Sequence, residues 1–81
     1  MNFKIISPNI QEALEALESI RDKLNSKSIS ETEFQIQLQH VYHHLNVAWN
    51  IRHKATDLYK NMTTGDFLTW RKYPSDLDFD E

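Results

Sequence analysis

Cysteine is absent from this chain, and glycine occurs only once, as Gly65. The lack of cysteine excludes disulfide scaffolds, thiolate zinc sites and thiol nucleophiles. A single glycine excludes the glycine-rich loops that bind phosphate groups. The chain also has no run of about 18 apolar residues, so we expect no membrane-spanning segment. It shows no apolar leader typical of a secretory signal peptide. These absences predict a small cytoplasmic protein with no membrane association.

The net charge and the content of hydrophobic residues narrow the class of protein further. The 81 residues carry a formal net charge of −3, which argues against a dedicated nucleic-acid-binding protein. Hydrophobic residues make up 40% of the chain, too many for a disordered protein of so little net charge. This length allows one small domain, which we place at residues 1–74, followed by an acidic tail at residues 75–81. No combination of residues typical of an enzyme is present, so we expect no catalytic residues and no cofactor.

Apolar residues at helical spacing predict the first helix. Ser7 and Pro8 are typical of a helix start, because serine caps well and proline is tolerated at the first helical position. The helix is expected to run for about 18 residues to a polar loop at residues 25–28. Its core-facing stripe is predicted to be Ile10, Leu14, Leu17, Ile20 and Leu24.

A second helix is predicted to begin at Ser30, which has the spacing of a capping box with Glu33. Glycine and proline are absent from there to Gly65, so this helix is expected to run for about 32 residues, or roughly 48 Å. It is expected to end at Gly65 in a left-handed conformation. A short third helix is predicted at residues 66–72. The fold class is therefore all-α, an antiparallel hairpin with a long second helix. Since the first helix covers little more than half of the second, we expect two copies to pair as a four-helix homodimer.

Residues 34–51 contain no Asp, Glu, Lys or Arg. Amides and imidazoles are buried at less cost than full charges when they are hydrogen-bonded, and apolar residues surround this helix, which favours burial on two faces. We therefore expect a subunit interface here. An interface with an unidentified protein partner, or chance composition, is the alternative. The expected interface residues are Leu38, Val41, His44, Leu45, Ala48, Trp49, Ile51 and Leu58.

Histidines are concentrated in the same segment. His40 and His44 lie four residues apart on one helix face, which is a workable pair of metal ligands. His43 lies about 100° away around the helix. A helical metal site normally adds carboxylates, and none lies between Glu33 and Asp57. We therefore expect structural histidines and no metal. Binding of a metal or small ligand by His40, His43 and His44 is the alternative.

The second half of the chain interleaves basic and aromatic residues, a pattern that also occurs in proteins that bind single-stranded nucleic acid.

The string from Tyr42 to Arg52, followed by Phe67, Trp70 and residues 73–77, resembles a small family of uncharacterised bacterial proteins. The resemblance covers roughly the second half of the chain and implies no activity or ligand. Leu77 and Phe79 in the acidic tail are expected to dock, either near the basic side chains of Arg52, Lys54 and Lys60 on the second helix or on a partner protein.

The expected function is a non-enzymatic protein–protein interaction or adaptor module. The alternatives are a histidine-based metal or small-ligand sensor and a nucleic-acid-associated regulator.

Overall fold

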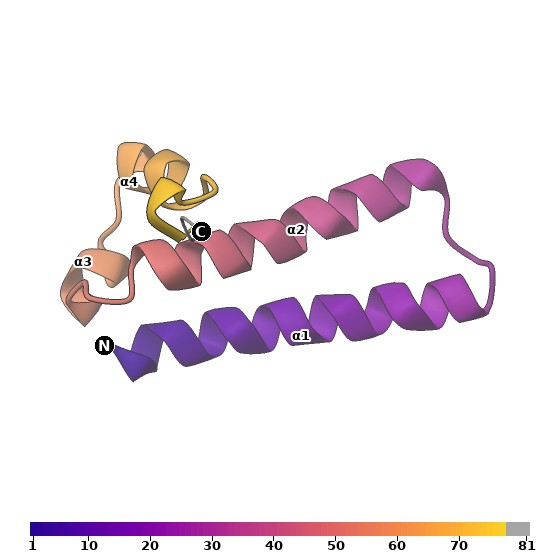
Figure 1. Cartoon of the computed structure of the whole chain (residues 1–81), viewed down its shortest axis with the longest axis horizontal. Coiled ribbons are helices and arrows are strands. Elements are labelled where there is room, and N and C mark those ends of the chain that lie inside the picture. Colours follow the sequence, from indigo (N-terminus) through magenta and orange to yellow (C-terminus); the bar gives the residue numbers. More distant parts are fainter. Residues whose placement is uncertain (78–81) are drawn as a thin grey trace, which may run out of the picture.

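A computed structural model describes residues 1–77 and shows an all-α helical hairpin. Its two long helices, α1 (Phe3–Asn25) and α2 (Glu31–Asn50), run antiparallel, and the N-terminus lies beside the end of α2 (Figure 1). The elements that follow turn back near that end: α3 (Thr56–Lys60), α4 (Thr64–Trp70) and the 3-10 turn η1 (Ser75–Leu77). Residues 1–77 contain no strand, and none of the helices they form combines the length and the hydrophobicity that spanning a bilayer requires.

The first helix begins earlier than predicted, and Pro8 lies inside it. The predicted cap at Ser7 is wrong, because Asn2 is the N-cap. The backbone N–H of Asn2 donates to the Arg52 carbonyl at 2.7 Å, and its Nδ2 donates to the Lys54 carbonyl at 2.9 Å. Tertiary contacts with the turn after α2 therefore set the start of α1, which a local pattern does not reveal.

The loop between the two long helices is closed by a Schellman motif. Lys27 has a left-handed backbone, with φ at 54°. Its N–H donates to the Leu24 carbonyl at 3.1 Å, and the N–H of Ser28 donates to the Lys23 carbonyl at 2.9 Å. This pair of bonds satisfies carbonyls that the last turn of α1 leaves without partners. The chain can then reverse within five residues.

The start of α2 is as predicted, since the Ser30 hydroxyl accepts a hydrogen bond from the Glu33 N–H at 3.1 Å. The carboxylate of Glu33 does not return to Ser30. It forms an ion pair with Lys23 of α1 and accepts a hydrogen bond from Gln37 Nε2 at 3.2 Å. This acid therefore joins the two helices next to their connecting loop.

The predicted continuous helix from Ser30 to Gly65 is wrong. α2 ends at Asn50, and the chain turns through residues 51–55 before α3. No glycine or proline marks this turn, and it is held by burial of the Ile51 side chain, which is 0% exposed. Gly65 lies inside α4 with no positive φ, so it terminates no helix. At 23 and 20 residues, α1 and α2 have similar lengths. The length mismatch that suggested a second copy is thus absent.

The core consists of two clusters of buried side chains. Of the predicted stripe on α1, Ile20 is buried, whereas its other members remain about half exposed: Ile10, Leu14, Leu17 and Leu24. The buried row is shifted around the helix to Ile5, Asn9, Ala13 and Ile20. Ala13 occupies the contact with α2 and the larger leucines lie on the flank of α1. One cluster joins Ile5, Val47, Ile51 and Trp70, and the other joins Ala13, Ile20 and Val41.

Candidate functional site

The outer side of α2 is covered by α4, and asparagines make the connection. Asn46 Nδ2 donates to the Arg71 carbonyl at 2.8 Å. Asn50 Nδ2 donates to the carbonyls of Trp70 at 2.7 Å and Lys72 at 3.0 Å. These carbonyls lie at the C-terminal end of α4, where a helix lacks its own donors. The side-chain amides of Asn46 and Asn50, in the uncharged segment at residues 34–51, therefore find hydrogen-bond acceptors within the same chain.

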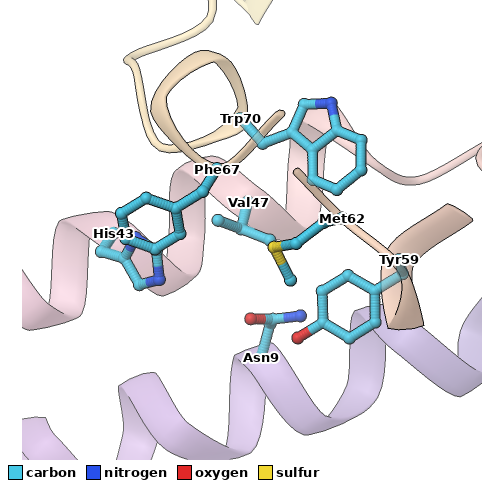
Figure 2. Close-up of a pocket in the computed structure, with 7 residues that line it drawn as sticks. All are labelled: Asn9, His43, Val47, Tyr59, Met62, Phe67 and Trp70. Atoms are coloured by element: carbon cyan, nitrogen blue, oxygen red, sulfur yellow. The ribbon is translucent and has the colours of Figure 1, made fainter. Parts of the chain in front are cut away.

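A small cavity of about 60 Å³ lies where α2, α3 and α4 meet α1 (Figure 2). The ring of His43 faces that of Phe67, with 5.0 Å between ring centroids. A water molecule needs about 10–15 Å³ of such space, so the cavity has room for a few waters and none for a nucleotide-sized cofactor. Its walls are formed by Asn9, His43, Val47, Tyr59, Met62, Phe67 and Trp70.

His43 belongs to the wall of this cavity. Burial is the main cause that lowers its pKa below the ordinary 6.5, and the nearby charges of His44, Arg71 and His40 lower it further. A neutral imidazole packed on an aromatic ring is the expected form near pH 7. Of the three histidines proposed as ligands, His43 is thus the one directed toward α4.

His44 is oriented by Asn9, the one buried polar residue among residues 1–77, which is 2% exposed. Asn9 Nδ2 donates to the Ile5 carbonyl at 2.7 Å, so its amide oxygen faces His44. That oxygen lies 2.9 Å from His44 Nδ1. Because an amide oxygen only accepts, Nδ1 carries the hydrogen and Nε2 keeps its lone pair. Burial lowers the pKa of His44, as does His40, while Glu12 raises it.

Glu12, His40 and His44 form a cluster on one flank of the hairpin. Their carboxylate oxygen and ring nitrogens lie within 4.8 Å of one another. The two rings meet edge to face, with centroids 4.6 Å apart. Glu12 and His40 are exposed and His44 is half-buried, so the cluster is open to solvent. The sequence of α2 offers no carboxylate near the two histidines, and α1 places one beside them.

The opposite flank carries an apolar groove of about 370 Å³. At about 100° per residue, Leu45 lies about 140° around α2 from His40, and Ile10 lies about 160° around α1 from Glu12. The groove therefore faces away from the Glu12–His40–His44 cluster. Its walls are formed by Met1, Ile6, Ile10, Leu45, Ala48, Trp49, Arg52 and Leu77.

One end of the groove is closed by the start of the acidic tail. Trp49 Nε1 donates to the Asp76 carboxylate at 2.9 Å, and Arg52 lies 3.4 Å from the same carboxylate. The Arg52 guanidinium also stacks over the Trp49 ring at 3.8 Å. The hydrogen bond from Trp49 is the main cause that lowers the pKa of Asp76, and Arg52 adds to it. The predicted anchor Leu77 lines the groove, and Phe79 lies outside the described residues.

The residues predicted for a subunit interface divide into three groups. Val41, Ala48 and Ile51 are buried by contacts within one chain. Leu38 packs partly against the core, and His44 bonds to Asn9. Leu45 is exposed in the wall of the groove, where Trp49 is half-buried. Leu58 is exposed on α3.

Sequence reasoning missed Asn9 and Glu12, which lie on α1. The signal for Asn9 was its place in the buried row between Ile5 and Ala13, at a spacing of four residues. No local signal identifies Glu12, because it resembles the other exposed acids of α1. Comparison with models of protein families, with curated proteins and with solved structures gives no match to this chain.

Proposed function

We propose that this protein is a non-enzymatic interaction module that pairs with a second copy of itself through the apolar groove. The observation that carries the proposal is an apolar groove along α1 and α2 that is open to solvent and whose lining includes one charged side chain, that of Arg52. Leu14 and Leu17 continue the row of Ile6 and Ile10 along α1, at the spacing of one helix face. Both leucines remain about half exposed.

The small core supports the need for a partner. Within residues 1–77, eight hydrophobic side chains are buried, two of which are alanines, and fourteen large ones are exposed. Soluble monomers seldom display continuous apolar patches of more than a few hundred Å². Covering the groove would remove part of this surface from water, at about 25 cal/mol for each Å² of apolar area.

The size of the flank suits a dimer. From Ile6 to Leu24, α1 is about 27 Å long, and two adjacent helices are about 20 Å wide. This flank, on which Arg21 is also exposed, presents about 540 Å² in projection, and the corrugation of side chains raises the area toward the 800 Å² or so per partner of a typical stable interface. The pairing would place four helices of similar length in one bundle.

The charge of the groove favours a second copy over a different partner. In a two-fold interface, a patch meets its own equivalent, so a patch with net charge would repel itself. Arg52 is the charged residue among those lining the groove, and it is paired with Asp76. The remaining lining side chains are apolar and therefore complementary to themselves.

The test is the mass of the protein in solution, measured by sedimentation equilibrium from low to high micromolar concentration. We expect the mass of two chains. Leu14→Asp and Leu45→Asp should give folded single chains, because these positions are 47% and 41% exposed and a charge there is hydrated once the partner has left. Ile36→Asp is the matched control, since Ile36 is 60% exposed and lies outside the groove. A wild-type chain that is monomeric at high micromolar concentration, or aspartate variants that remain dimeric, would refute the proposal.

A further inference from the structure

We propose that Glu12, His40 and His44 bind one divalent transition-metal ion of the zinc class, which bridges α1 and α2. Their ligand atoms already lie within 4.8 Å of one another. Around Zn²⁺, with bonds of about 2.0–2.2 Å to nitrogen and oxygen, tetrahedral ligand atoms lie about 3.4 Å apart. Small torsional changes close this difference, because the side chains of Glu12 and His40 are exposed to solvent.

The donor set selects the class of metal. Imidazole nitrogen suits zinc, copper, nickel and iron, whereas calcium and magnesium prefer a shell made wholly of oxygen. Two neutral imidazoles and one carboxylate leave a net positive charge on a bound divalent ion. With three ligands from the protein, the fourth position of a tetrahedral ion is left to water or to a ligand from solution.

Asn9 supplies an independent reason to regard the cluster as a built site. Metal-binding histidines characteristically donate the hydrogen of their second ring nitrogen to a fixed acceptor, which holds the ring in the binding tautomer. The contact of 2.9 Å between His44 Nδ1 and Asn9 Oδ1 provides this arrangement. Asn9 is itself buried and held by the Ile5 carbonyl. The lone pair of His44 Nε2 is therefore available before any ion arrives.

Binding would stabilise the folded hairpin. Glu12 is far from the two histidines in the sequence, so an unfolded chain does not hold all three ligands together and the ion binds the folded state in preference. Because Glu12 belongs to α1 and both histidines belong to α2, the bound ion connects the two helices directly. The cluster lies on the flank opposite the apolar groove, so this inference does not depend on the proposed dimer.

The experiment is a titration of the metal-free protein with Zn²⁺ in competition with a chromophoric chelator, together with thermal melting of each sample. We expect one ion per chain and a rise in melting temperature when zinc is present. Glu12→Gln and His40→Ala should each lower the affinity for zinc by at least about tenfold. Glu18→Gln and His53→Ala are matched controls at exposed positions outside the cluster, and they should bind zinc as the wild type does.

The outcomes separate the bridging site from simpler alternatives. If His40→Ala loses zinc while Glu12→Gln keeps full affinity, the ion binds a histidine pair on α2 alone and the bridging site is wrong. One ion per two chains would place the metal at a dimer axis and would also overturn the assignment, as would the absence of zinc binding. Glu12 and His40 are exposed, so circular dichroism of both variants should match the wild type. Sedimentation of the same samples reports on the dimer separately.

Discussion

Replacement of Ile51 by alanine provides a direct test of where α2 ends. Ile51 follows the last residue of α2, and its side chain is 0% exposed in the cluster with Ile5, Val47 and Trp70. In the continuous helix that the sequence predicts, this position has no glycine or proline to mark it as special. The cost of the substitution therefore depends on the tertiary structure.

The expected magnitude follows from complete burial. The change removes three side-chain carbons and leaves a cavity between α1, α2 and α4. Large-to-small substitutions of this type cost about 2–5 kcal/mol, and we expect Ile51→Ala to fall at about 3–4 kcal/mol because the site is fully enclosed. A chain of this size has a free energy of unfolding of roughly 4–12 kcal/mol. The variant should therefore lose about a quarter or more of its free energy of unfolding.

The assay is urea unfolding followed by far-UV circular dichroism, with all variants at one chain concentration because association contributes to apparent stability. Ile51→Val should cost about 0.5–1.5 kcal/mol. Ile36→Ala is the matched control, since Ile36 is 60% exposed in the middle of α2, and it should change stability by no more than about 0.5 kcal/mol. If Ile51→Ala and Ile36→Ala cost the same, the account of the turn and of the core is refuted.

Three further outcomes are expected. Ala55→Pro should cost less than about 1 kcal/mol, because Ala55 has φ −72° at the N-cap of α3, whereas proline inside a continuous helix costs about 3 kcal/mol; urea unfolding distinguishes the two. The lowered pKa values of His43 and His44 mean that the unfolded chain binds protons more readily, so stability is fully present above about pH 6.5 and declines as the pH falls below it. Melting in EDTA should therefore show a lower midpoint at pH 5.5 than at pH 7.5, and an equal or higher midpoint would contradict this. Asp76→Ala removes the acceptor of Trp49 Nε1 and should change the tryptophan emission while the melting temperature stays nearly constant, because the carboxylate is exposed; unaltered emission would argue against that contact.

Local chemistry was sufficient to predict the class of fold and several helix ends. The apolar spacing and the shortage of glycine and proline predict helices, and two long helices joined by a short loop form the hairpin. Ser30 caps α2 because its hydroxyl needs only the N–H three residues further on. A short helix close to the predicted residues 66–72 is present as α4. Each of these features depends on residues within one or two helical turns of one another.

Contacts between residues that are far apart in the sequence decided the other helix ends, the buried face of α1 and the candidate metal site. The turn after α2 is held by burial of Ile51 and by Asn2, which is about 50 residues away in sequence and donates to the Lys54 carbonyl. Contact with α2 buries Asn9 and Ala13 on α1 and leaves its leucines exposed. The candidate metal site likewise joins Glu12 to a histidine pair on another helix. A sequence pattern reports the periodicity of one segment, but which faces of two helices meet depends on how closely their side chains allow them to approach.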